Sequence, residues 1–213
     1  MSRFKWFILP LILITLDAFS APKGCQNLSE CIDTVGKLTG TKYFYTEKFK
    51  GLTQSSNNVQ LNKENADTIL SLYLYENGYA RIPIGTKEYK IISARDIRYQ
   101  ANPHFQVVNY DVSSIPDNHD FIMASVALKA PEASIEITKS LRPFLSRYGR
   151  VLGPNTGGNI ILQDTGANIR RMIPIIADMD VKPSSEALET IKLNKQRQHE
   201  IELARAQNCK KQD

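Results

Sequence analysis

Residues 126–180 read VALKAPEASIEITKSLRPFLSRYGRVLGPNTGGNIILQDTGANIRRMIPIIADMD, and this stretch decides the fold because each of its segments has the period of one secondary-structure element. The apolar run at 121–129 predicts a strand that is buried on both faces. Apolar side chains then recur at 133–145 with the spacing of an amphipathic helix, which Gly149 ends. The stretch therefore begins as a strand followed by a helix.

The second half of this stretch predicts a hairpin and a closing helix. Arg150–Leu152 and Asn159–Leu162 form two short strands joined by the turn-rich GPNTGG. The closing helix has apolar residues on one face and Arg170 and Arg171 on another, and Pro174 predicts either a kink or a helix restricted to its first half. The fold class is therefore α+β, and the unit is βαββα, built like a KH domain.

No part of this unit has the pattern of a catalytic or ligand-binding site. GPNTGG lies between two strands and lacks the lysine and helix start of a phosphate-binding loop, and no glycine pair joins two helices as in the nucleic-acid-binding loop of KH domains. His104, His119 and His199 are scattered, without carboxylates or cysteines at ligand spacing. We expect no enzyme activity, no metal or other cofactor and no small-molecule substrate.

The charge of the chain also argues against nucleic acid. The formal net charge is +5 over 213 residues, and residues of both signs are interspersed along the chain instead of forming a basic stripe. With no catalytic, metal or nucleic-acid signal, we expect the protein to function by packing against other proteins.

The N-terminus has the form of a secretory signal peptide, residues 1–20. Two basic residues precede an apolar run from Trp6 to Leu16, and small residues follow, so that cleavage is expected after Ser20. An uncleaved membrane anchor is the alternative, but the run is shorter than the roughly 20 residues that a spanning helix needs. The chain is therefore expected to be exported.

Export places the cysteines where disulfides persist. Cys25 and Cys31 are close enough in sequence to bridge, and Cys209 is left over. Cys31 also falls on the apolar stripe of a predicted helix, so a buried free thiol is the alternative.

The chain divides into a first domain at 21–96, a connector at 97–119, a second domain at 120–182 and a charged segment at 183–213, which is either a helix capped by Ser184 or a frayed tail. The connector is proline-rich and polar, with one strand expected at Val107–Val112. The first domain is expected to contain the elements that follow. They are a helix at 27–40 capped by Asn27, strands at 41–46, 52–55 and 59–61, a helix at 62–78 capped by Asn62, and a hairpin of YARIPI and EYKIIS.

This order of segments resembles the periplasmic N-terminal domains of secretins, the channel proteins of type II and type III secretion and of type IV pili. DTVGKLTGTKYFYTEKFKG, a helix ending in NGYA and a hairpin ending in YKIISARD resemble the first of these domains. VALKAPEASIEITKSLRPFL and NIILQDTGANIRRMIPIIADMD are similar to the small domain that follows, with a helix that begins at AN and closes on Ile-x-x-x-Asp. The resemblance covers residues 24–182.

The resemblance implies a non-enzymatic periplasmic component of a type II-like secretion or pilus system, associated with the outer-membrane secretin complex. Its implied partners are inner-membrane or channel-forming proteins, and the domains would stack in homo-oligomeric rings. No stretch has the repeated alternating strands of a membrane barrel, so we expect no pore from this chain alone. The alternative is a periplasmic ligand- or signal-binding module related to receptor signalling domains.

Small domains leave little room for an enclosed cavity, so binding is expected at strand edges and lateral faces. Pro83 guards the strand at Tyr79–Ile84, whereas the strand at Lys42–Thr46 has no such guard. The partner-binding candidates are therefore the residues of this unguarded strand and a set of arginines in the second domain. They are Lys42, Tyr43, Phe44, Tyr45 and Thr46, and Arg142, Arg147, Arg150, Arg170 and Arg171.

Overall fold

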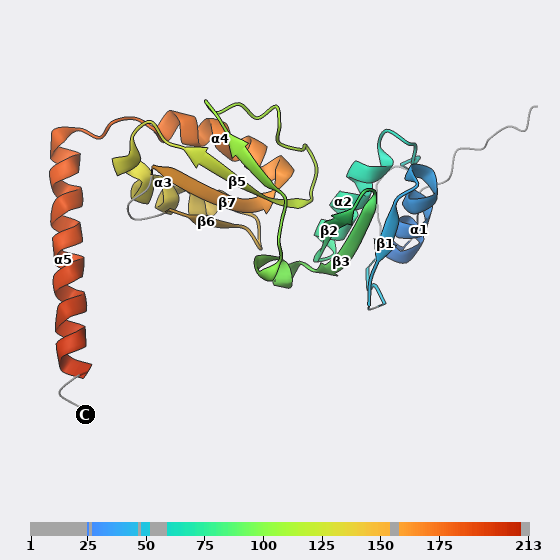
Figure 1. Ribbon diagram of the computed structural model, residues 1–213, viewed down its shortest axis with the longest axis horizontal. Coiled ribbons are helices and arrows are strands. Elements are labelled where there is room, and N and C mark those ends of the chain that lie inside the picture. Colours follow the sequence, from blue (N-terminus) through green and yellow to red (C-terminus); the bar gives the residue numbers. More distant parts are fainter. Residues whose placement is uncertain (1–24, 26, 47, 52–58, 154–157, 210–213) are drawn as a thin grey trace, which may run out of the picture.

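The computed structural model describes residues 25, 27–46, 48–51, 59–153 and 158–209. It has two small sheets, each packed with helices, and a long C-terminal helix that stands apart from both (Figure 1). This confirms the expected α+β class with two small domains. The expected signal peptide and the expected strand at 52–55 lie outside the described residues.

The first domain contains a three-stranded sheet and two helices. Its strand order is β1-β3-β2, with β1 parallel and β2 antiparallel to the central β3. The elements are α1 (Leu28–Thr39), β1 (Lys42–Phe44), α2 (Ala66–Glu76), β2 (Tyr79–Gly85) and β3 (Glu88–Ser93).

The ends of both helices follow local rules. Asn27 caps α1, since its Oδ1 accepts a hydrogen bond from the Glu30 N–H at 2.9 Å, and Gly40 ends the helix with a φ of 69°. Asn62 caps the turn that leads into α2. The strand expected at 59–61 is wrong, because these residues pair with no strand and Leu61 is buried in the core of α1 and α2 instead.

The second domain contains a four-stranded sheet with the order β4-β5-β7-β6. Its βαββα unit is the one expected from the sequence, and an extra strand, β4, pairs parallel to β5. A 3₁₀ helix, η1 (Ala94–Tyr99), leads from β3 to β4. The other elements are β4 (His104–Val107), β5 (Phe121–Ala127), η2 (Pro131–Ala133), α3 (Ser134–Leu141), η3 (Arg142–Phe144), β6 (Arg150–Leu152), β7 (Asn159–Thr165) and α4 (Gly166–Met179).

Three local expectations differ from the structure. The strand expected at 107–112 is wrong, since β4 ends at Val107 and the chain then turns with positive φ at Asn109 and Tyr110. The helix expected to run to Gly149 ends at Leu141, before a proline that disfavours continuation. Conversely, α4 continues through Pro174 as one helix of 14 residues.

The closing aspartate of the secretin-like helix has a structural role. The Asp180 carboxylate accepts hydrogen bonds from the backbone N–H groups of Lys129 (2.5 Å) and Ala130 (2.9 Å), and from the Tyr110 hydroxyl. It therefore ties the end of α4 to the segment after β5 and to the turn after β4.

The C-terminal segment forms helix α5 (Ser185–Cys209). Ser184 caps it, because its hydroxyl accepts a hydrogen bond from the Ala187 N–H at 3.2 Å. Its described side chains are mostly exposed, and Figure 1 shows it separated from the two sheets. No helix among the described residues is both long enough and apolar enough to cross a membrane.

Candidate functional site

The edge of the first sheet formed by β1 is open. In the part of the chain that the structure describes, β1 pairs with β3 on one side and with no strand on the other. The opposite edge strand, β2, lies against the second domain and contains Pro83, which cannot donate to a partner. The structure therefore agrees with the sequence in making β1 the less protected edge.

The register of β1 shows which main-chain groups face outward. The Lys42 N–H donates to the Lys87 carbonyl of the adjoining turn at 2.8 Å. Because main-chain groups alternate in direction along a strand, the Tyr43 N–H faces away from β3. Such a group can pair with an added strand. The strand expected at Lys42–Thr46 is shorter than predicted, since β1 ends at Phe44 and Tyr45 and Thr46 follow it.

Side chains next to this edge form an exposed apolar groove of about 530 Å³. Phe44 is 48% exposed and Ile84 is 55% exposed, and the aliphatic stem of Lys90 lies between the two strands that carry them. Tyr45 and Thr46 complete the lining. An apolar groove beside an open strand edge suits a partner segment that contributes both backbone and side chains.

Tyr43 is a candidate whose side chain points inward. Its hydroxyl accepts a hydrogen bond from Arg81 at 3.3 Å, and its ring lies 6.1 Å from that of Tyr89. Burial raises the pKa of Tyr43 to about 12, although the Arg81 charge opposes the shift. Tyr43 therefore offers a partner its backbone and not its ring.

Arg81 on β2 is the centre of a charge network that the sequence analysis missed. Its side chain is 1% exposed and binds two carboxylates, Asp67 at 2.7 and 2.6 Å and Asp120 at 2.7 and 2.8 Å. The guanidinium also lies 4.8 Å from the Tyr89 ring centre. A charged residue within the otherwise apolar YARIPI strand is the sequence signal that could have indicated it.

The pKa values in this network follow from burial. Burial alone lowers the pKa of Arg81, but the hydrogen bonds that it donates to Asp67 and Asp120 outweigh burial and raise the pKa above its ordinary value. Burial raises the pKa of Asp120, with Arg81 acting in the opposite direction. One cation therefore binds two carboxylates.

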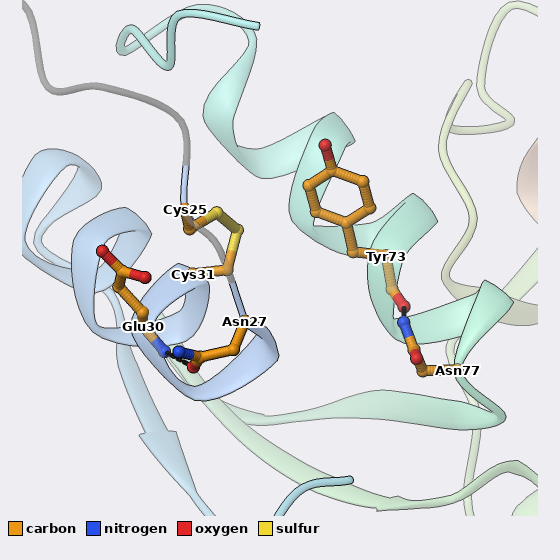
Figure 2. The surroundings of a disulfide bond; sticks show 6 residues. All are labelled: Cys25, Asn27, Glu30, Cys31, Tyr73 and Asn77. Carbon is orange, nitrogen blue, oxygen red and sulfur yellow. Dashed lines mark hydrogen bonds between the residues drawn. A yellow bond between two sulfur atoms is a disulfide. The ribbon is translucent and has the colours of Figure 1, made fainter. Parts of the chain in front are cut away.

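A disulfide joins Cys25 to Cys31, with the Cα atoms 4.8 Å apart (Figure 2). Cys31 is also fully buried on the apolar face of α1, as its place in the apolar stripe predicted, but it is bonded to Cys25 and is not the free thiol of the alternative interpretation. The bridge spans the Asn27 cap and attaches the entering chain to the first turn of α1.

Two of the candidate arginines hold the second domain together. Arg150 donates from Nε to the Gln163 side chain on β7. Arg170 donates from Nη1 to the carbonyls of Val112 and Ile115, each at 2.7 Å. These guanidinium groups bind the protein's own acceptors, so they are less suited to a partner than the sequence suggested.

The other three arginines are more available. Arg142 in η3, Arg147 before β6 and Arg171 in α4 are exposed, and Arg171 donates to the Asn168 side chain at 2.9 Å. Arg150, Arg170 and Arg171 each bind a different set of acceptors within the domain.

A second groove, of about 340 Å³, lies beside β3 and η1. Aromatic residues Tyr45, Phe49, Tyr79 and Tyr99 line it together with polar groups that include Asp96. Among the described residues, no group of three or more His, Cys, Asp or Glu side chains is placed to hold a metal ion.

Comparison with solved structures identifies the fold. The chain is similar to a chain of the Klebsiella pneumoniae type II secretion system outer-membrane complex of PulD, PulS and the PulC HR domain, with a TM-score of 0.60 and 20% identity. The match covers 76% of this chain and 26% of the other, so the chain spans about a quarter of that protein's length. The fold is that of secretin N-terminal domains.

Two further structures belong to the same group. The N-terminal domain of the secretin XcpQ from Pseudomonas aeruginosa is 19% identical, with 75% of this chain and 64% of that chain covered and a TM-score of 0.28. The GspC–GspD complex of enterotoxigenic Escherichia coli is 15% identical, with coverage of 76% and 99% and a TM-score of 0.27. No protein-family model matches the chain, and no curated protein matches it.

Proposed function

We propose that this chain, which has the fold of secretin N-terminal domains, is a non-enzymatic component of a type II-like secretion or pilus machine. It acts in the periplasm through protein–protein contacts. The observation that carries the proposal is the open β1 edge on this fold, with the outward Tyr43 N–H beside the exposed Phe44 and Ile84. The occupant is a strand of an inner-membrane or channel-forming component of the machine.

The physical support for this occupant is backbone pairing combined with apolar burial. A strand added beside β1 would satisfy main-chain groups that otherwise face water, and its alternate side chains would cover the groove. The exposed guanidinium groups of Arg142, Arg147 and Arg171 would orient neighbouring copies in a ring. In this proposal residues 1–20 direct export, and the domains at 21–96 and 120–182 are the binding units.

Affinity capture from an envelope extract of the source cell tests the proposal. The compared proteins are the wild type, Tyr43→Pro, which removes the outward N–H donor, and Tyr43→Thr, which keeps this donor; both variants lack the Tyr43 ring. We expect Tyr43→Thr to recover more of a secretion component than Tyr43→Pro by about threefold to tenfold, as for the loss of one hydrogen bond.

Two results would reject different parts of the proposal. Recovery of no secretion component by the folded wild-type chain would reject the role in a secretion machine. Equal recovery by all three proteins would reject the β1 edge as the binding site and leave the role in place.

The aromatic groove beside η1 favours a second candidate function, a ligand- or signal-binding module. Its volume lies at the lower end of the range of small-molecule sites, and it combines aromatic faces with a carboxylate. Tyr99→Ala removes one wall of this groove, which Tyr43 does not line. Loss of partner capture with Tyr99→Ala but not with Tyr43→Pro would favour this alternative.

A further inference from the structure

We propose that Asp67, Arg81 and Asp120 form a latch that holds the two domains in one relative orientation. Arg81 belongs to β2 of the first domain, Asp67 to α2 of the same domain, and Asp120 immediately precedes β5 of the second. One guanidinium therefore joins carboxylates from two domains that have separate sheets and separate helix-packed cores. The proposal concerns the orientation of the domains and is independent of any partner.

The geometry of the Arg81 contacts is directional. Nε and Nη2 donate to the two oxygens of Asp120, while Nη1 and Nη2 donate to the two oxygens of Asp67. Paired bonds from a planar guanidinium allow a narrow range of angles between donor and acceptor. Rotation of one domain against the other would break the paired bonds from Arg81 to Asp120, while Asp67 holds the guanidinium within the first domain. Water has little access to the bonds to Asp120, because Arg81 is 1% and Asp120 16% exposed.

The second domain holds Asp120 rigidly on its side of the latch. The Asp120 carbonyl accepts a hydrogen bond from the Gly166 N–H at the start of α4 (3.0 Å), and the Asn118 carbonyl accepts one from Ala167 (2.8 Å). Gly166 permits this approach, since a Cβ there would come within 2.3 Å of the Pro116 carbonyl oxygen. The loop that presents Asp120 is therefore fixed to the first turn of α4.

The apolar part of the junction is less specific. Ala80, Ile82, Ala94 and Ile97 meet Phe121 in a small cluster, whose contribution depends on buried area and not on direction. Such a cluster can hold two domains together in several orientations. The junction also contains hydrogen bonds from the His119 N–H to the Ser71 hydroxyl (3.1 Å) and from Gln163 Nε2 to the Ile97 carbonyl (3.2 Å), and the Arg81 network adds the paired, charge-assisted contact that favours one orientation.

The latch also fixes the β1 edge with respect to the second domain. Arg81 donates to the Tyr43 hydroxyl of β1 at 3.3 Å through Nη1, the same nitrogen that binds Asp67. The open edge, the arginine and Asp120 therefore form one continuous chain of contacts from the first domain to the second.

Distance measurement between spin labels tests the latch in the purified protein. Lys37→Cys in α1 and Asp178→Cys in α4 place one label on an exposed position of each domain, and Cys209→Ser removes the remaining thiol outside the disulfide. We expect a narrow distance distribution with the native network. In Asp67→Asn/Asp120→Asn the distribution should broaden at least about twofold, because the paired charge-assisted bonds are lost.

Two further variants complete the experiment. Asp117→Asn removes an exposed carboxylate close to Asp120 but outside the network, and it should leave the distribution narrow. Arg81→Lys retains the charge but cannot bind two carboxylates in the paired geometry, so the distribution should broaden. Amide NMR spectra establish that both domains remain folded in each variant. If the double variant unfolds, the width of the distance distribution in Arg81→Lys tests the latch instead. A distribution that stays narrow in folded Arg81→Lys would overturn the latch and assign the orientation to the rest of the junction.

Discussion

The two sheets differ in the interactions that stabilise them. The four-stranded sheet packs α3 and α4 over a continuous apolar core, in which Leu162 of β7 and Ile173 of α4 are fully buried. The three-stranded sheet shares a core with α1 and α2, but it meets its neighbouring domain through buried Arg81 and leaves β1 open. The second domain is stabilised mainly by this apolar packing, whereas the first also contributes a charge network near its β2 edge; both sheets have edge strands that pair on one side only, β1 and β2 in the first and β4 and β6 in the second.

Among changes at the junction of the two domains, Arg81→Met should cause the largest loss in the free energy of unfolding. It leaves the Asp120 carboxylate in a largely buried site without its cation, while Asp67 can hydrate because 43% of its side chain is exposed. We expect the free energy of unfolding to fall by about 3 kcal/mol, at the lower end of the range for a broken buried ion pair. Urea denaturation followed by circular dichroism measures it.

Leu162→Ala is the matched substitution in the packed domain. It removes a fully buried side chain without exposing a charge, and it should cost about 2–5 kcal/mol through lost burial and a cavity. Replacing Asp120 by Asn in the Arg81→Met protein should restore part of the stability lost by Arg81→Met, because it removes the unpaired charge. Absence of any restoration would mean that Arg81 contributes by packing, as Leu162 does.

Removal of the disulfide should have the next largest effect. Cys25→Ser/Cys31→Ser opens a ring with a sequence separation of 6, which corresponds to about 2 kcal/mol by the entropy of loop closure. The same denaturation measurement should show the loss in the first domain only. Equal loss of amide protection in α1 and α4 by hydrogen exchange would contradict this restriction.

The helix caps allow a comparison of the two domains through smaller losses in the free energy of unfolding. Asn27 caps α1 from an exposed position, whereas Thr165 caps α4 from a buried one and accepts from the Asn168 N–H at 3.3 Å. We expect Asn27→Ala to lower the free energy of unfolding by about 1 kcal/mol and Thr165→Ala by about 1–2 kcal/mol. Thermal unfolding of both variants shows which cap contributes more to stability. A larger loss for Asn27→Ala than for Thr165→Ala would contradict the expectation that the buried cap contributes more.

The smallest effect on stability is expected at high pH, where burial raises the pKa of Tyr43 and Tyr89 in the first domain and of Tyr110 in the second. Burial raises the pKa of Tyr43, and burial together with Asp180 raises that of Tyr110, each to about 12. The folded state thus keeps protons that the unfolded state loses near pH ~10, so stability declines as the pH rises from ~10 to ~12.

Ultraviolet titration of tyrosinate checks this expectation. Tyr43→Phe and Tyr110→Phe should each remove one late-titrating group. Unchanged late titration in either phenylalanine variant would contradict the assignment of that tyrosine.

Much of the fold was predictable because its elements follow local rules. The short apolar strand pattern at 159–162 and the helical period that follows it predicted β7 and α4, and Asn27 and Gly40 marked the ends of α1. Strand β4 was not predictable in the same way. Its four residues have little pattern of their own, and they are extended because they pair with β5.

The candidate site was likewise predictable only in part. The sequence indicated the β1 edge, because Pro83 makes the other edge strand unsuitable for pairing. It could not indicate that Tyr43 points inward or that Arg150 and Arg170 bind the protein's own carbonyl and amide groups. Those contacts depend on which side of each element faces a neighbour.

By itself, the sequence determined the α+β class, the βαββα unit and the cysteine pair available for a disulfide, since periodicity, capping and short-range spacing act within a few residues. Only the tertiary structure decided the role of Arg81, whose acceptors lie 14 and 39 residues away in the chain. A buried arginine is stable only where carboxylates meet it, and that meeting depends on how two domains dock, which no local pattern in the chain encodes.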